Sequence, residues 1–295
     1  ARRQRQMCIR DRLWRELRGK RTLIRTSASG AQKSLGPHGD DTQAMYDSFV
    51  ARKSAAEARL KALKTQLATQ QRLNRALRVG RVPNVVVGVI NALESIGVQE
   101  HFLVVGTHAL YAYESAAGVR ITEEAMATRD VDMLFDTRKH ISFFTTMKKL
   151  DSSLIGVLRK VDPSFEVVED QLYTARNQDG FEVDIIRRAA KDADPHPLRM
   201  SDEDDDFWAV QVSMGERLQS ARRVDQMVVA TSGEMALMRT IHPLDFARIK
   251  LGLSRQLGRD PNKSGRDALQ SLIVTELVEE YLPHFLLAAP EAGNT

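Results

Sequence analysis

Residues 128–135 read Thr-Arg-Asp-Val-Asp-Met-Leu-Phe, and this stretch decides the fold. An apolar run opened by two acidic residues predicts a buried strand with polar residues at its start. Asp130 and Asp132 lie two positions apart, so on a strand their side chains project from the same face. Two adjacent carboxylates raise each other's pKa unless a cation lies between them. Because Mg²⁺ takes carboxylate and phosphate oxygens as ligands, the segment predicts a magnesium site.

Two other segments are compatible with the same chemistry. Residues 101–106, His-Phe-Leu-Val-Val-Gly, predict a strand that ends in a glycine turn, and a helix is expected from Thr107 to Ala117. Gly106 would let the backbone approach a phosphate, and Thr107 would add a hydroxyl and N–H groups that suit an anion. Residues 181–186 predict a strand with Asp184 at its centre, which could supply a third carboxylate. Two metal ions roughly 4 Å apart could then stabilise the attacking and leaving oxygens of a phosphoryl transfer.

Each of these segments alone is common, but their order along the chain is specific. It resembles the nucleotidyltransferase superfamily, which includes DNA polymerase beta, poly(A) and CCA-adding enzymes, aminoglycoside nucleotidyltransferases and toxin components of abortive-infection systems. The resemblance covers about residues 100–190. It implies that Asp130 and Asp132 bind the metals and the nucleotide, and that Asp184 helps to activate the acceptor hydroxyl. The larger bacterial members, such as the abortive-infection type, are the nearest in pattern.

The sequence departs from the superfamily pattern in two places. Thr107 stands where glycine or serine is usual, so its methyl group would crowd a triphosphate. The gap of 24 residues between Gly106 and Asp130 is longer than in the smallest members. The segments 242–251 and 259–267 resemble the helices that follow the catalytic domain in larger members, where a lysine often faces the nucleotide. Lys250 is therefore the candidate for a triphosphate contact, with a solvated helix lysine as the alternative; Arg266 and Asp267 are interpreted as capping and packing charges.

The whole chain is predicted to be an α/β (α+β) protein with a mixed central sheet. We expect a lead-in over residues 1–40, a long helical arm over 41–82, a catalytic domain over 83–230 and a helical subdomain over 231–295. The arm holds one unbroken helical pattern from about residue 42 to 79. It carries a narrow apolar stripe formed by Phe49, Ala56, Leu60, Leu63 and Leu67. Such a stripe predicts packing on the same domain, on a second copy in a homodimer or on a protein partner.

The N-terminal residues have an unusual composition. Residues 1–12 resemble translated sequencing-adapter read-through, with a genuine basic arm for RNA or phospholipid as the alternative. Residues 13–40 are rich in glycine and serine, which predicts a flexible lead-in. Residues 1–40 hold 11 Lys/Arg against 3 Asp/Glu, and the remainder holds 32 against 36. Because the remainder is slightly acidic, a large nucleic acid is not favoured as a partner.

Composition excludes several classes of protein. Hydrophobic residues make up 42% and charged residues 28%, which favours a globular chain over a disordered one. We find no apolar run of about 18 residues and no secretory signal pattern, so the sequence predicts a cytoplasmic protein with no membrane partner. A single cysteine, Cys8, supports neither an internal disulfide nor a cysteine-based zinc site. The seven histidines show no metal-ligand spacing.

The leading functional hypothesis is transfer of a nucleoside monophosphate from a nucleoside triphosphate to an acceptor hydroxyl, with release of pyrophosphate. The expected cofactor is Mg²⁺ at a two-metal site, with Mn²⁺ as an alternative. The acceptor could be a protein, an RNA or a small molecule, and analogy with the abortive-infection members suggests a toxin–antitoxin role. The alternatives are a non-catalytic protein that binds a nucleotide or a partner on the same fold, and a metal-dependent phosphohydrolase.

Overall fold

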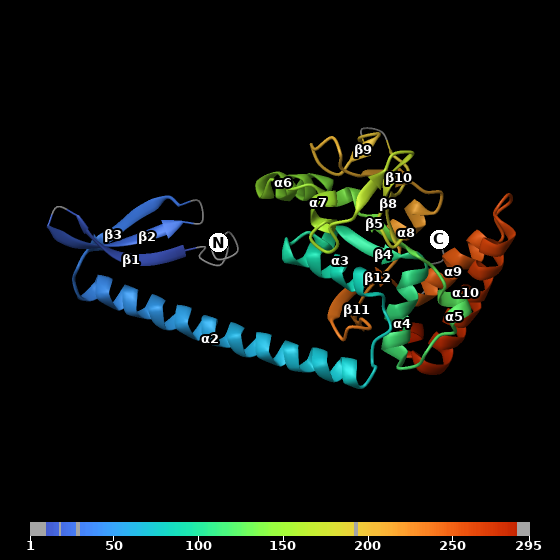
Figure 1. Cartoon of the computed structure of the whole chain (residues 1–295), viewed down its shortest axis with the longest axis horizontal. Coiled ribbons are helices and arrows are strands. Elements are labelled where there is room, and N and C mark those ends of the chain that lie inside the picture. The colour runs from blue at the N-terminus through green and yellow to red at the C-terminus, as the bar shows by residue number, and fades with distance from the viewer. Residues whose placement is uncertain (1–9, 18, 28–29, 192–193, 288–295) are drawn as a thin grey trace. The chain divides into compact units, whose positions relative to one another are not determined.

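The computed structural model describes residues 10–17, 19–27, 30–191 and 194–287. Most of the segment that resembles adapter read-through, residues 1–9, lies outside the described residues. The chain divides into two compact units, Ala1–Gln70 and Gln71–Thr295 (Figure 1). Each unit is described below by itself.

The N-terminal unit is folded, which corrects the expectation of a flexible lead-in. It contains three antiparallel strands in the order β1-β2-β3, followed by one long helix. The helix ends within three residues of the predicted boundary, and its last residues belong to the second unit. The elements are β1 (Arg10–Leu17), β2 (Lys20–Ser27), β3 (Gln32–Pro37) and α2 (Asp40–Ala76).

Glycines mark the hairpin turns of this small sheet. Gly19 and Gly30 connect the three strands and have φ angles of +72° and +83°, a conformation that favours glycine. Leu23 and Ile24 of β2 are buried. The Trp14 ring of β1 lies 5.7 Å from the Tyr46 ring of α2, centroid to centroid. A local composition typical of linkers therefore belongs to a small sheet stabilised by apolar contacts.

The C-terminal unit combines nine strands with several helices. The helices are α3 (Asn84–Ser95), α4 (Leu110–Ala117), α5 (Glu123–Met126), α6 (His140–Leu150), α7 (Leu154–Leu158), α8 (Gly215–Ser220), α9 (Pro243–Ser254), α10 (Pro261–Tyr281) and α11 (His284–Leu287). Short 3-10 turns are η1 (Gln99–His101), η2 (Gly106–Ala109) and η3 (Thr137–Lys139). The strands are β4 (Phe102–Val105), β5 (Asp130–Phe135), β6 (Glu166–Val168), β7 (Gln171–Arg176), β8 (Glu182–Arg187), β9 (Leu198–Arg199), β10 (Trp208–Gln211), β11 (Arg223–Val229) and β12 (Met235–Ile241).

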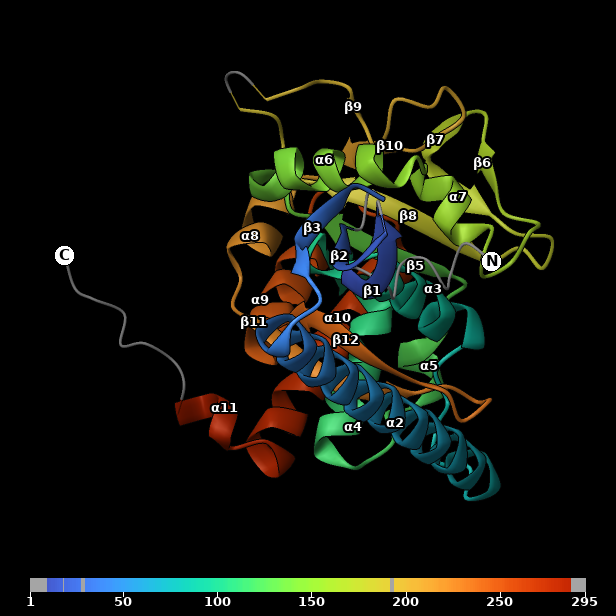
Figure 2. The ribbon, with the colours of Figure 1, turned by 90° about the vertical axis from the view of Figure 1, so that its left-hand side faces the viewer.

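Seven strands form a mixed sheet, which confirms the predicted fold class. The main order is β4-β5-β8-β10-β9, with β5, β8 and β10 parallel and β4 antiparallel to β5. The β6–β7 hairpin extends the sheet through β7, which pairs antiparallel with β8 (Figure 2). Strands β5 and β8 contribute these buried apolar residues to the core: Val131, Met133, Leu134, Val183, Ile185 and Ile186.

Strand β12 corrects the expectation of an all-helical C-terminal subdomain. It pairs in antiparallel register with β11, so the expected boundary at residue 230 cuts through a hairpin. Its residues Met-Ala-Leu-Met are good helix formers, which explains the wrong prediction. Burial on alternate positions, Ala236, Met238 and Thr240, shows that pairing and packing override this local preference. The later helices α9 and α10 agree with the prediction; they pack on each other, and α10 also packs on α4 (Figure 1).

Asp206 ends the acidic run 201–206. Such a run is typical of a solvated loop, but Asp206 is only 1% exposed. Its carboxylate accepts hydrogen bonds from the backbone N–H groups of Leu154 and Ile155, at 2.9 and 2.8 Å. These are donors at the start of α7 that have no partner within the helix. Asp206 therefore fixes the beginning of a short buried helix from a distant loop.

No helix in the described part of the chain combines the length and the apolar character needed to cross a bilayer.

Candidate active site

Three carboxylates meet where strands β5 and β8 lie side by side. The parallel register pairs Asp132 directly with Asp184, and Asp130 shares a strand face with Asp132. One carboxylate oxygen from each residue lies within 4.8 Å of the other two. The sequence placed these residues on two separate strands, and the pairing of those strands brings them into one cluster.

Two hydroxyl groups hold the outer carboxylates. Thr174 on β7 is buried, and its Oγ1 donates a hydrogen bond of 2.6 Å to the Asp184 carboxylate. The Thr128 hydroxyl donates to the Asp130 carboxylate. Thr174 was not recognised from the sequence, because the β7–β8 pairing that places it opposite Asp184 is a tertiary feature.

Asp132 depends on the glycine turn after β4. Gly106 has a φ of +65°, and a Cβ atom built on it would overlap the Asp132 carboxylate. The turn therefore needs glycine for two reasons: the backbone conformation and the space taken by Asp132. This role differs from the predicted close approach to phosphate, and it links the first motif physically to the second.

We expect Gly106→Ala to damage the site more than the fold. The added methyl group must displace Asp132, and the positive φ adds strain of about 1–3 kcal/mol. The variant should lose divalent-cation binding at least tenfold while it keeps its circular dichroism spectrum. Calorimetric titration with Mn²⁺ measures this, and Gly118→Ala serves as the control, because Gly118 has a φ of +68° but nothing near its Cβ position. Equal loss of binding in both variants would show that strain alone accounts for the effect.

The cluster carries an excess of negative charge that is only partly balanced. Burial, followed by the charges of Asp130 and Asp184, raises the pKa of Asp132 to about 7. Lys250 and Arg266 oppose this rise through their positive charges. Burial also raises the pKa of Asp184. The hydrogen bond from Thr174 opposes this rise, but the pKa stays above its ordinary value. Three close carboxylates with acceptor-only oxygens suit a hard divalent cation, so the residues present fit the metal that the motif predicts.

Thr107 lies beside the cluster but faces the protein interior. It is 6% exposed, and its hydroxyl accepts a 3.1 Å hydrogen bond from Gln270 Nε2 of α10. Gln270 also donates to the Ala125 carbonyl at 2.7 Å. The geometry therefore gives this hydroxyl a role in attaching α10 to the turn, and it does not support the predicted contact with phosphate.

Comparison with known proteins identifies the family. A family model described as nucleotidyltransferase matches residues 84–292. The chain belongs to this nucleotidyltransferase family. The match covers most of the C-terminal unit, including the three carboxylates and helices α9 and α10. No curated protein and no solved structure matches the chain.

Helices α9 and α10 of this family member carry Lys250 and Arg266, the two cations whose charges act on Asp132. Lys250 is buried, and its Nζ lies 2.8 Å from Asp267, which also binds Arg259 at 2.5 Å. The prediction of a solvated lysine is therefore wrong, but the ammonium is already paired. Asp260, whose carboxylate accepts from two backbone N–H groups, caps α10, so Asp267 is no cap.

Arg266 is the cation that the sequence undervalued. Its guanidinium donates a 3.0 Å hydrogen bond to the Ala127 carbonyl, just before β5. Its Nε is buried with no partner among the described residues, and its charge acts on Asp132. No carboxylate forms an ion pair with Arg266 in the described part of the chain. Of the two cations that act on Asp132, Lys250 is paired with a carboxylate and Arg266 is not, so Arg266 is more available to bind a ligand.

Several other polar side chains have structural contacts. The Tyr113 hydroxyl is buried and donates to the Ile241 carbonyl at 2.8 Å, and Tyr111 packs beside His108. Burial lowers the pKa of His108 to about 4, so this histidine is neutral near pH 7. Arg187, which follows Asp184 on β8, is 1% exposed and donates to His196 Nδ1 at 2.9 Å. None of these side chains adds a ligand to the cluster of three carboxylates.

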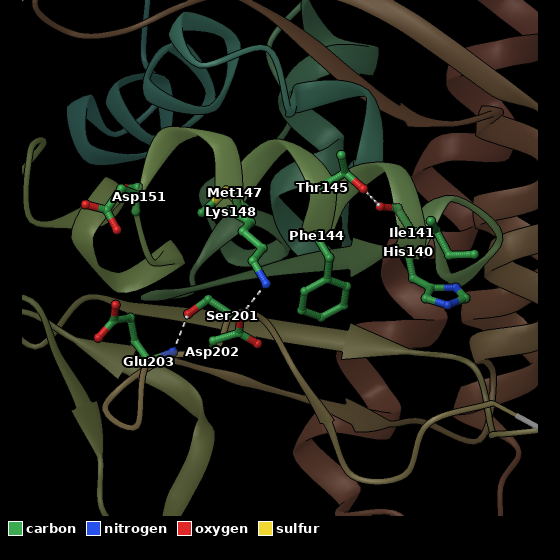
Figure 3. Close-up of a pocket in the computed structure, with 11 residues that line it drawn as sticks. His140, Ile141, Phe144, Thr145, Met147, Lys148, Asp151, Ser201, Asp202 and Glu203 are labelled. Carbon is green, nitrogen blue, oxygen red and sulfur yellow. Dashed lines mark hydrogen bonds and ion pairs between the residues drawn. The ribbon is translucent and has the colours of Figure 1, made fainter.

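A separate pocket of about 540 Å³ lies between α6 and the loop after β9 (Figure 3). Phe144 lines it, and Lys148 and Asp202 face each other 4.0 Å apart. None of the three clustered carboxylates lines this pocket. This pocket is therefore distinct from the site formed by the three carboxylates.

Proposed function

We propose that this nucleotidyltransferase moves a nucleoside monophosphate from a nucleoside triphosphate to an acceptor hydroxyl. The acceptor oxygen forms a bond to the α-phosphorus, the bond to the β-phosphate oxygen breaks, and pyrophosphate leaves. The observation that carries the proposal is the close cluster of Asp130, Asp132 and Asp184 within a chain of this family. The acceptor is a protein, an RNA or a small molecule.

Each carboxylate has a distinct proposed role. Asp130 and Asp132 would hold Mg²⁺, or Mn²⁺ in its place, with Asp184 as the third carboxylate of a two-metal site. When bound, the cations neutralise charge on the triphosphate and on the leaving pyrophosphate. Asp184 accepts the proton of the acceptor hydroxyl. Its raised pKa supports this role, because a carboxylate that holds a proton more tightly is a better general base near neutral pH.

The elements around the carboxylate cluster suggest where the triphosphate would bind. Gly106 and Thr107 form the turn beside Asp132, and Lys250 and Arg266 lie on the helices that follow. We propose that Arg266 contacts the triphosphate. Lys250, which is already paired with Asp267, would contribute only through its charge. The cytoplasmic setting, the toxin–antitoxin role and the likeness to abortive-infection members stay predictions.

The two cations can be separated by kinetics. Arg266→Ala should raise the KM for the nucleoside triphosphate about tenfold or more, since a phosphate contact is worth roughly 1.5–3 kcal/mol. Arg266→Lys should recover part of the loss. Lys250→Met should instead lower the melting temperature, because it leaves Asp267 with one cation instead of two. Steady-state kinetics and thermal unfolding of the three variants check this. A KM unchanged by Arg266→Ala would exclude the contact.

The proposed reaction is tested by pyrophosphate release. The purified full chain is incubated with each nucleoside triphosphate, Mg²⁺ and a fractionated cell extract, and compared with Asp184→Asn. Thr174→Val is the matched control for positioning, because it removes the hydrogen bond to Asp184 and keeps the carboxylate. We expect release by the wild type, a partial rate with Thr174→Val and almost none with Asp184→Asn. Equal rates for all three proteins, or orthophosphate as the product, would rule out the proposal.

A further inference from the structure

The charge of the chain is divided between its two units. Residues 1–70 hold 16 Lys/Arg against 6 Asp/Glu, a balance of +10, while residues 71–295 hold 27 against 33, a balance of −6. Without residues 1–12 the N-terminal unit still holds 11 against 5. The positive charge thus belongs to a folded unit of strands and a helix, and the average over the chain conceals it.

Helix α2 arranges part of this charge in a line. Lys53, Lys61 and Lys64 fall on one helix face, because their separations of eight and three residues are close to whole turns. Arg59 adds a cation on another face, and Glu57 is the single acidic residue between positions 51 and 70. Lys53 forms an ion pair with Asp11 at 3.3 Å. Arg59, Lys61 and Lys64 are exposed, and no ion pair involves them within the described residues.

The small sheet adds a second set of cations. Lys20, Arg21 and Lys33 are exposed on β2 and β3. The Arg21 guanidinium lies over the Trp14 ring at 5.2 Å from its centroid, which fixes its position. Exposed cations are therefore present on the strands as well as on the helix of this unit.

Two other occupants fit this surface less well. A second copy of α2 would bring its own lysines and arginines against those that flank Leu60 and Leu67, and like charges repel. An anionic membrane binds an amphipathic helix through aromatic and leucine side chains on its apolar face. The aromatic residues of α2 instead contact the sheet, with Tyr46 beside Trp14 and Phe49 under Arg12. These contacts favour a ligand that is recognised by its charge.

We propose that the N-terminal unit binds nucleic acid through its phosphate groups. Nucleic acids carry closely and regularly spaced negative charges, and neutralising them releases bound counterions, which drives association with a basic surface. The proposal stands apart from the transfer reaction, because it concerns a different unit and needs no catalysis. It reverses the expectation that a large nucleic acid is disfavoured, which relied on treating the basic residues as an unfolded lead-in.

Fluorescence anisotropy of a labelled 20-nucleotide single-stranded RNA, titrated with the full chain in chelator, tests the proposal. The test variant is Lys61→Glu with Lys64→Glu. The control is Lys149→Glu with Lys160→Glu, which makes the same change in net charge on exposed residues of the other unit. A third protein, Lys61→Gln with Lys64→Gln, removes the two charges with less risk to the helix, and circular dichroism checks all variants. A duplex DNA and vesicles of anionic phospholipid complete the set of ligands.

We expect the wild type to bind RNA with an affinity that falls steeply as salt rises. The test variant should bind at least tenfold more weakly, and its slope of log affinity against log salt should be smaller by about 1–2. The glutamine variant should show an intermediate loss, and the control should change less than threefold. Three results would overturn the proposal: no binding to RNA or DNA at low salt, equal losses in test and control, or binding to vesicles only.

Discussion

The double variant Asp130→Asn with Asp132→Asn is expected to lose nucleotidyl transfer by at least a thousandfold. Both residues belong to the cluster in which one oxygen of each carboxylate lies within 4.8 Å of the others. Asparagine keeps the shape but removes two negative charges, so the remaining Asp184 cannot hold a divalent cation against water. A thousandfold loss corresponds to about 4 kcal/mol of transition-state stabilisation, a reasonable value for the loss of cation charge on a reacting phosphate.

Kinetics at saturating nucleotide and acceptor would measure this effect. The control is Asp136→Asn with Asp225→Asn, which makes the same chemical changes outside the cluster. Asp136 pairs with Arg138 and Arg223, and Asp225 pairs with Arg239, so this control also reveals how much activity is lost through stability alone. A variant without Asp130 and Asp132 that retained more than a tenth of the wild-type rate would exclude a catalytic role for the pair.

The second large effect concerns stability in the absence of metal. Burial and two neighbouring carboxylates raise the pKa of Asp132 to about 7 in the folded protein, against 3.8 for an ordinary aspartate. Between these pH values the unfolded chain releases a proton that the folded chain keeps, so stability falls as pH rises and the loss is complete above about pH 7. The shift corresponds to an upper bound of about 4 kcal/mol.

Asp132→Asn should therefore be more stable than the wild type at pH 8 in chelator, by roughly 5–10 °C in melting temperature. At pH 4–5 the two proteins should differ little, because Asp132 is then protonated. Mg²⁺ should stabilise the wild type and have little effect on the variant, which reverses their order at pH 8. Thermal unfolding at both pH values, with and without Mg²⁺, checks all three statements. If the variant melts below the wild type at pH 8 in chelator, the ionised Asp132 does not destabilise the folded protein.

The sequence was sufficient to predict the cluster, because its information is local. A two-residue spacing on a strand fixes the common face of Asp130 and Asp132, and an apolar run predicts the strand itself. The partners of these residues were not predictable in the same way. Thr174, Gln270 and Asp267 act across strand pairings and helix contacts that no short motif encodes.

The errors in the fold have a related cause. Strand β12 has residues that favour a helix, and only its pairing with β11 makes it a strand. The sheet of the N-terminal unit was read as a linker because its glycines and serines, Gly30 among them, were counted as signs of flexibility. Gly30 instead lies in the turn of a hairpin, as Gly19 does in the preceding one. In both places the local composition did not reveal which strands pair with each other, and that pairing determines the secondary structure.

We propose that a nucleoside monophosphate, and no other part of the nucleotide, is transferred to the acceptor at this cluster. Parallel reactions with nucleoside triphosphate labelled at the α-phosphate or at the γ-phosphate test this proposal. We expect the α-label to become attached to the acceptor and the γ-label to appear in pyrophosphate, and both signals to vanish in Asp130→Asn with Asp132→Asn. Transfer of the γ-label to the acceptor, or α-label incorporation that survives the loss of both aspartates, would contradict it.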